Sequence, residues 1–144
     1  MRTDFLVMAD KAEAINGKLY MIGGGFDNVT VASFPGMAAY DIAFAFLVDY
    51  GETNVPHEFS LQLKDADSND VLPPLGGRIE VGRPPGMDPG QEQRVMIVFQ
   101  GPFPVTGGGA FKWVPSLDGH EGPATRFRVN ELPAAQPRRR RATG

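Results

Sequence analysis

Hydrophobic and polar residues alternate with a period of two along several stretches of this chain. The longest alternation covers residues 40–50, and its large apolar side chains are Ile42, Phe44, Phe46 and Val48. Shorter alternations cover residues 57–64 and 94–100. Successive side chains of a strand point to opposite faces, so this period predicts β-strands. Since no stretch shows a comparable helical period, the sequence predicts an all-β protein.

Turn-forming residues separate these stretches. Asn16-Gly17 lies between two apolar segments and predicts a hairpin, because both central positions of a type I′ turn need positive φ. Gly23-Gly24-Gly25 precedes a further strand, so it indicates a bulge or a close backbone approach rather than a phosphate-binding loop. About eight or nine short strands are expected at this spacing. They predict a single two-layer antiparallel β-sandwich, immunoglobulin-like or C2-like.

Composition agrees with that fold and narrows the chemistry. The 144 residues include 18 Gly and 13 Pro, which suits many tight turns. Cysteine is absent, which excludes disulfides, thiol catalysis and cysteine metal sites. The apolar run over residues 5–9 is flanked by Asp4 and Asp10 and is too short for a signal segment or a membrane span. We therefore expect a cytoplasmic protein without membrane contact.

The charges are unevenly distributed along the chain. The net charge is −3, and the run Arg138–Arg141 contributes +4, so the rest of the chain carries −7. An acidic body disfavours nucleic-acid binding, which depends on neutralising phosphates, and leaves only the arginine run for such a contact. The run follows Pro133 and Pro137, and no apolar period continues past them. We expect a sandwich domain at residues 1–132 and a disordered tail at residues 133–144.

The histidines and acidic residues do not form a recognisable catalytic motif. His57 and His120 are the two histidines, and His120 stands with Asp118 in a segment typical of a hairpin turn. A catalytic triad also requires a serine held beside a histidine, which neighbours in sequence cannot show. The sequence therefore predicts a protein without enzymatic activity or cofactor. The alternative is a hydrolase that uses His120 and Asp118.

Asp65, Asp67, Asn69 and Asp70 resemble the start of a calcium-binding loop, with oxygen ligands at alternate positions. Asp70 stands where such a loop needs its glycine, and Gly76 stands where it needs a bidentate glutamate. We expect a solvated turn and no metal site here. Asp65, Asp67 and Asp70 are the ligands that the alternative, a calcium site, would use.

Two strands are apolar on both faces, and this is the strongest functional signal in the sequence. Behind their main apolar residues lie Ala43 and Ala45 in the first strand, and Met96 and Val98 in the other. If both strands belong to one sheet, its outer surface needs a cover. The cover could be the loop over residues 82–90 or another molecule, including a second copy of the chain.

Two further features bear on binding. Arg83 precedes Pro84 and Pro85, which stiffen the loop, so its guanidinium would lose little freedom on binding a carboxylate. These three residues are candidate partner contacts, with a solvated surface loop as the alternative. Phe111 and Trp113 share one strand face, and we expect them in the core rather than in a sugar-binding platform.

Several short motifs mark the chain: Asp4-Phe5-Leu6, Ala9-Asp10, Asn16-Gly17-Lys18-Leu19-Tyr20, Gly23-Gly24-Gly25 and Gly82-Arg83-Pro84-Pro85-Gly86. Together they resemble an uncharacterised bacterial β-sandwich family, a domain of unknown function. The resemblance extends over residues 4–130 and implies the sandwich fold but no substrate. We expect a non-catalytic binding or assembly module for a protein partner or for itself. The alternative is a domain that binds a small ligand, carbohydrate or calcium through its end loops.

Overall fold

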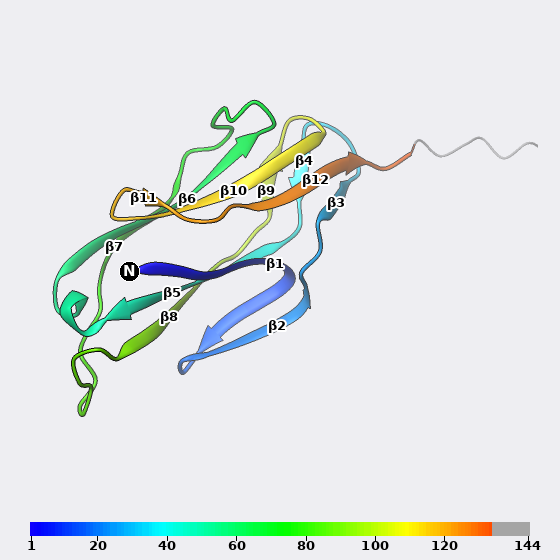
Figure 1. Cartoon of the computed structure of the whole chain (residues 1–144). Coiled ribbons are helices and arrows are strands. Elements are labelled where there is room, and N and C mark those ends of the chain that lie inside the picture. Colours follow the sequence, from blue (N-terminus) through cyan, green and yellow to red (C-terminus); the bar gives the residue numbers. More distant parts are fainter. Residues whose placement is uncertain (134–144) are drawn as a thin grey trace, which may run out of the picture.

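A computed structural model describes residues 1–133, which form strands and one 3₁₀ turn but no α-helix (Figure 1). The elements are β1 (Arg2–Ile15), β2 (Lys18–Gly24), β3 (Asn28–Val31), β4 (Gly36–Ala38), β5 (Asp41–Asp49), η1 (Tyr50–Glu52), β6 (Pro56–Asp65), β7 (Leu75–Glu80), β8 (Glu92–Phe99), β9 (Phe103–Val105), β10 (Gly109–Leu117), β11 (His120–Glu121) and β12 (Thr125–Glu131). The all-β prediction is confirmed. The expected number of strands is wrong, because the described residues form twelve. The additional strands β4, β9 and β11 have only two or three residues, too few to show a period of two.

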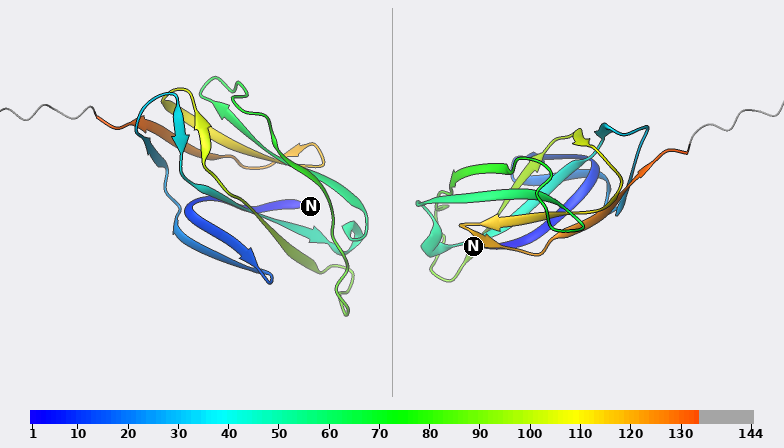
Figure 2. Two further views of the ribbon diagram at one scale, coloured as in Figure 1. Left: turned by 180° about the vertical axis from the view of Figure 1, so that it is seen from behind. Right: turned by 90° about the horizontal axis from the view of Figure 1, so that it is seen from above.

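The strands form three sheets. The first has the order β2-β1-β5-β8, and the second has the order β3-β12-β10-β6-β7 with β11 paired to β10. β4 and β9 form the third. Neighbouring strands run antiparallel except for β3 and β12, which are parallel, so the expectation of a purely antiparallel arrangement is wrong at this edge. The two larger sheets face each other across the core, as Figure 2 shows from behind and from above.

The four-stranded sheet is curled. β1 pairs with β5 from Arg2 to Ala9 and then continues as one arm of a hairpin with β2. The turn residues Asn16 and Gly17 have φ of 50° and 74°, which confirms the predicted hairpin. Gly23 has φ of 64°, and a Cβ atom there would collide with the Asp10 carboxylate. The close approaches at Gly23 and Gly24 are made by the side chains of Asp10 and Met21, and nothing lies close to Gly25, so the expected close backbone approach is not present at the three glycines.

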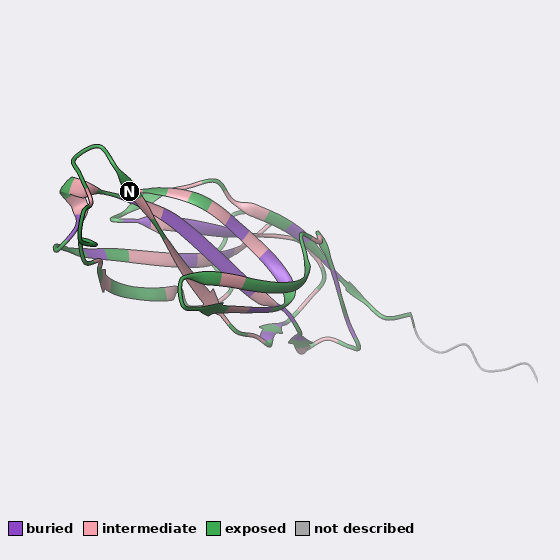
Figure 3. Cartoon of the chain, turned by 90° about the horizontal axis from the view of Figure 1, so that it is seen from below, coloured by how far each residue is buried: buried purple, intermediate pink, exposed green. Residues whose placement is uncertain are grey.

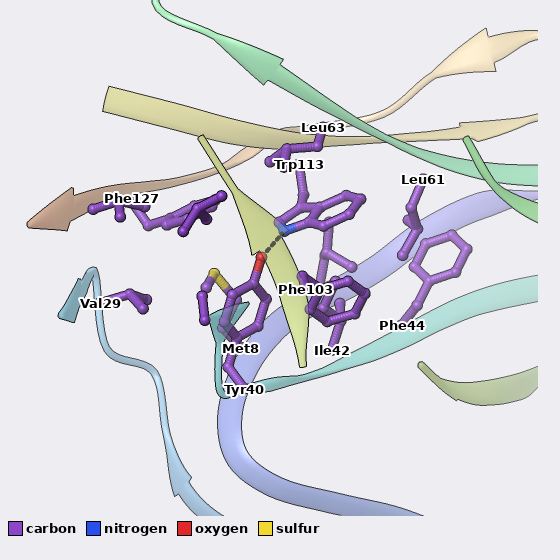
Figure 4. Close-up of a cluster of buried hydrophobic side chains, with 14 of the residues drawn as sticks. Met8, Val29, Tyr40, Ile42, Phe44, Leu61, Leu63, Phe103, Trp113 and Phe127 are labelled. Carbon is purple, nitrogen blue, oxygen red and sulfur yellow. Dashed lines mark hydrogen bonds between the residues drawn. The ribbon is translucent and has the colours of Figure 1, made fainter. Parts of the chain in front are cut away.

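The core between the large sheets includes Leu61, Leu63 and the large residues of β5 that the alternation indicated, and it also includes residues without that signal, among them Met8, Tyr40 and Phe103 (Figure 4). The large, fully buried side chains that β5 contributes are Ile42, Phe44, Phe46 and Val48. Trp113 faces them from β10 and donates its Nε1–H to the Tyr40 hydroxyl at 3.0 Å. Burial raises the pKa of the Tyr40 phenol far above its usual range, so this hydroxyl stays neutral. The Trp113 indole N–H is thus satisfied inside the core.

The two aromatic residues of β10 have the role expected from their shared face. Trp113 is fully buried, and Phe111 is partly buried and stacks on Phe127 with 5.9 Å between ring centroids. Their interpretation as core residues is confirmed.

Residues 134–144 lie outside the described part of the chain, and the Arg138–Arg141 run lies there too. The domain boundary at residue 132 and the disordered tail stay predictions. Within residues 1–133, no helix combines the length and the apolar character that crossing a bilayer requires.

Candidate functional site

The second apolar face predicted for β5 and β8 exists, and its two alanines are covered. Ala43 pairs with Val98, and Ala45 pairs with Met96, in the register of the two strands. Ala45 is 0 % exposed and Ala43 is 1 % exposed, whereas Met96 and Val98 are half-buried. The alanines therefore offer no surface unless their cover moves. Partner contact at these four residues stays a prediction.

The cover over Ala43 is the hairpin formed by β1 and β2. Ala12 of this hairpin is fully buried and packs with Ala9 and Ala43, and Leu19 borders the cluster. The Ala12 amide donates to the Asp41 carboxylate at 2.9 Å, which attaches the hairpin to the start of β5. Of the two alternatives that the sequence left open, the structure has a cover from the same chain. The covering segment is the β1–β2 hairpin rather than the proline-rich loop over residues 82–90.

The outer side of the same hairpin exposes large apolar side chains. Three of them, here called the hairpin patch, are Ile15 (46 % exposed), Tyr20 (55 %) and Ile22 (71 %), which share one face of the hairpin. Met21 (40 %) points to the other face, beside Ala12. Figure 3 shows the hairpin, mostly exposed, in front of buried strands of its sheet. The other exposed large apolar residues of the described chain are scattered over separate elements. A contiguous apolar patch marks an interaction site more often than isolated residues do.

β2 is an edge strand, and the register of the hairpin determines which of its backbone groups have no partner. In a two-residue hairpin the flanking pair, Ile15 and Lys18, exchanges both hydrogen bonds. Every second pair repeats this pattern, so Tyr20 and Ile22 direct their backbone groups toward β1. The residues whose N–H and C=O groups point to the free edge are the alternate ones, Leu19 and Met21, and the left-handed backbone at Gly23 (φ of 64°) ends the alternation.

The other edges of the two large sheets carry features that discourage further pairing. β3 has four residues, and β7 follows Pro73-Pro74 and carries Arg78. β8 carries Arg94, and its far end lies beside residues 13–15 of the hairpin. β2 has seven residues, no proline and no charge after Lys18. Among the described residues, β2 is therefore the least protected edge.

The proline-rich loop holds Arg83 against the chain itself. Arg83 donates from Nε to Thr53 Oγ1 at 2.9 Å and from Nη2 to the Tyr50 carbonyl at 3.1 Å. Its guanidinium also lies over the Tyr50 ring, 3.6 Å from the centroid. Pro84 and Pro85 are exposed. Partner contact by these three residues stays a prediction, and Arg83 would have to give up the bonds described here to make it.

The clearest polar cluster joins His57 to Asp118. His57 Nδ1 lies 2.7 Å from Asp118 Oδ2, and Nε2 lies 2.7 Å from the Glu52 carbonyl oxygen. Both partners are acceptors, so a protonated, cationic ring donates from both nitrogens at once. Burial disfavours this charge, but the hydrogen bonds to Glu52 and Asp118 outweigh it and raise the pKa of His57. The Glu52 carboxylate, in turn, pairs with the amino group of Met1.

Sequence reasoning associated Asp118 with His120, whereas the structure joins it to His57. Asp118 Oδ1 also accepts the Glu58 amide at 2.8 Å, which is the main reason that the pKa of Asp118 is lowered. His120 is exposed on β11. The pair His57–Asp118 joins β6 to the turn after β10, which is far away in sequence, so no spacing motif could have indicated it.

The loop after β6 is a hydrogen-bonded turn. Asp65 Oδ1 accepts the amides of Asp67 and Asn69, both at 2.9 Å, and the Asn69 amide is the main cause of the lowered pKa of Asp65. Asp70 pairs with Lys64 at 2.8 Å. Within residues 1–133, no three histidine or acidic side chains are grouped as a metal site requires. The geometry thus gives the calcium alternative no support.

A shallow hollow on the outer face of the six-stranded sheet gathers positive charge. Lys112 of β10 stands directly opposite Arg126 of β12, and Arg128 lines the same hollow. In the described part of the chain, none of the three cations forms an ion pair. Asp27 and Asp65 also line the hollow, although Asp65 is bonded to its own loop. Like charges directly opposite each other destabilise a sheet, so a bound anion would relieve their repulsion.

Comparison with known proteins found one family model, which covers almost all of the described residues. Residues 4–130 match the model of a family of unknown function, DUF6941, which confirms the resemblance seen in the sequence. No curated protein and no solved structure matches this chain. The comparisons therefore assign no chemistry to the residues described above.

Proposed function

The chain belongs to DUF6941, a family of unknown function, and we propose that it is a non-catalytic binding module that accepts an extended segment of a partner at the free edge of β2. One observation carries the proposal: an unprotected edge strand exposes the apolar side chains of Tyr20 and Ile22 beside unpaired backbone groups. In strand addition, main-chain hydrogen bonds supply affinity, and side chains at alternate positions supply selectivity. β2 offers both.

We also propose that the fold is a two-layer sandwich of the immunoglobulin-like or C2-like kind. Side chains from both large sheets share one core, with Phe44 from the first and Trp113 from the second. Such a core supports this arrangement, because two facing sheets bury their inner faces against each other. A sandwich of this kind would keep β2, the edge strand, in a fixed position and orientation.

The contacts of His57 support the non-catalytic part of the proposal. Both of its ring nitrogens are committed, to Asp118 and to the Glu52 carbonyl. A general base must instead have a free nitrogen within reach of the proton that it removes. His120 is exposed on β11 and makes neither of these contacts, so His120→Ala should leave the folded protein and its binding unchanged.

The test of the binding function compares Ile22→Lys with Thr30→Lys, a matched change at an exposed position of β3. Ile22→Lys should remove the partner proteins that are recovered with the tagged full-length chain, and Thr30→Lys should retain them. In the recovered complex, the amides of Leu19 and Met21 should exchange hydrogen more slowly than in the free chain. Equal recovery with both variants and unchanged exchange at Met21 would contradict the proposal.

The positive hollow favours a second candidate function, which is binding of a small anion. Lys112, Arg126 and Arg128 supply the donors, so the ligand class is a phosphate or carboxylate rather than a sugar or calcium. Inorganic phosphate should raise the Tm of the protein, and Arg126→Gln should abolish the shift. Equal shifts for both proteins, or none for either, would remove this candidate.

A further inference from the structure

We propose that the free edge of β2 pairs with the same edge of a second copy of this chain, in antiparallel register centred on Met21. The inference rests on the proposed function, because it names the partner of the same edge. The two four-stranded sheets would then continue into each other across a two-fold axis. Such a contact is self-complementary, which is the arrangement that closed homodimers use.

The unpaired backbone groups of β2 allow a register centred on Met21. Leu19 and Met21 direct their N–H and C=O groups to the free edge, whereas the left-handed backbone at Gly23 (φ of 64°) interrupts the alternation there. In the Met21-centred register, Met21 lies opposite Met21 of the second copy, and donors face acceptors in this pair, as an antiparallel ladder requires. The register therefore satisfies the backbone groups of Met21 that β1 leaves unpaired.

The same register brings the most exposed side chains together. Tyr20 lies opposite Ile22 of the second copy, and the two-fold axis repeats this contact. These are pairs without mutual backbone hydrogen bonds, in which the side chains approach most closely. Aromatic and β-branched residues opposite each other stabilise a sheet. Pairing would thus remove from water the two side chains of the hairpin patch with the largest exposed fractions.

Charge favours the antiparallel arrangement of two copies. Lys18 is the only charged residue of β2. A parallel arrangement in register would place Lys18 beside Lys18, which is destabilising. In the antiparallel register Lys18 lies opposite Gly24, which has no side chain, next to the position where the Asp10 carboxylate packs over Gly23. No like charges oppose each other along the paired strands.

The absence of cysteine from the chain permits a direct test by cross-linking. Directly opposed residues that exchange hydrogen bonds have Cα atoms about 5.5 Å apart, which a disulfide can bridge. Under mild oxidation Met21→Cys should form a covalent dimer. A mixture of Tyr20→Cys and Ile22→Cys proteins should form the mixed dimer in preference to either self-linked one. Thr30→Cys, on the exposed edge of β3, is the matched control and should stay monomeric.

A measurement without cross-linking tests the same contact. Sedimentation equilibrium of the unmodified chain should show a monomer–dimer equilibrium, and Ile22→Lys should weaken it about tenfold or more, because both symmetric contacts with Tyr20 are lost. Equal cross-linking of Met21→Cys and Thr30→Cys would overturn the proposal, as would a strict monomer at all concentrations. If the chain is monomeric but Ile22→Lys still removes a different partner protein, self-pairing fails and the proposed function stands. If Ile22→Lys changes neither, both fail.

Discussion

Ala43→Leu should loosen the hairpin from the sheet that it covers. Ala43 is almost completely buried and packs against Ala9 and Ala12, so a leucine there has no empty space beside it. Overpacking of this kind lowers the free energy of unfolding by about 1–3 kcal/mol. For a chain of this length, 1 kcal/mol corresponds to roughly 3–4 °C, so we expect the Tm to fall by about 3–12 °C.

Two assays separate a local effect on the hairpin from general destabilisation. Urea unfolding can be followed by fluorescence, because Trp113 is the only tryptophan and is fully buried. Hydrogen exchange at the Ala12 amide, which is bonded to Asp41, reports on attachment of the hairpin. In Ala43→Leu this amide should exchange faster than the amides of β10.

The matched control is Ala14→Leu, which changes an exposed residue of the same hairpin. Its effect on the free energy of unfolding should stay within about 0.5 kcal/mol. If Ala43→Leu is as stable as the unchanged protein and its Ala12 amide exchanges at the same rate, the hairpin does not cover β5 in solution. The account of the second apolar face would then be refuted.

Three further changes test the fold at other points. Tyr40→Phe leaves the buried Trp113 Nε1–H without an acceptor and should cost about 1–3 kcal/mol in urea unfolding, and an unchanged midpoint would contradict this contact. His57 has a raised pKa in the folded state, so its stabilising effect is complete below the unfolded pKa of about 6.5 and is lost as the pH rises through the folded pKa. His57→Gln should remove that decline, measured as the free energy of unfolding against pH, whereas His120→Gln should retain it. Gly17→Ala places a side chain at φ of 74° with no steric contact nearby, and should cost about 1 kcal/mol without altering the fold seen by circular dichroism.

The sequence predicted those parts of the fold that depend on local pattern. Alternation over residues 40–50 identified β5 and its core face, and Asn16-Gly17 identified the hairpin, because a turn type and a strand period are both local properties. The contact of Ala12 with Ala43 could not be predicted in this way. An alanine in a sequence does not indicate which surface its side chain will contact. The sequence therefore did not decide whether the same chain or another molecule covers the second apolar face.

In the candidate site, too, local features could be predicted from the sequence and contacts between distant segments could not. Exposed apolar residues in β2 were visible in the sequence as part of a strand, but edge position depends on sheet order, which alternation does not specify. The partnership of His57 and Asp118 requires β6 and the turn after β10 to lie side by side. Arg83 is an example in the other direction. The composition of its loop suggested a guanidinium free to bind a partner, but in the structure this guanidinium contacts Thr53 and Tyr50 of the same chain.

The parallel pair of β3 and β12 has a consequence for the order in which the protein is made. Asn28 pairs with Arg128, so β3 leaves the ribosome long before its neighbour exists. At typical rates of translation, roughly 5–20 s separate the two. During that interval the nascent chain presents an unfinished sheet, and a chaperone that shields β3 should increase the yield of native protein.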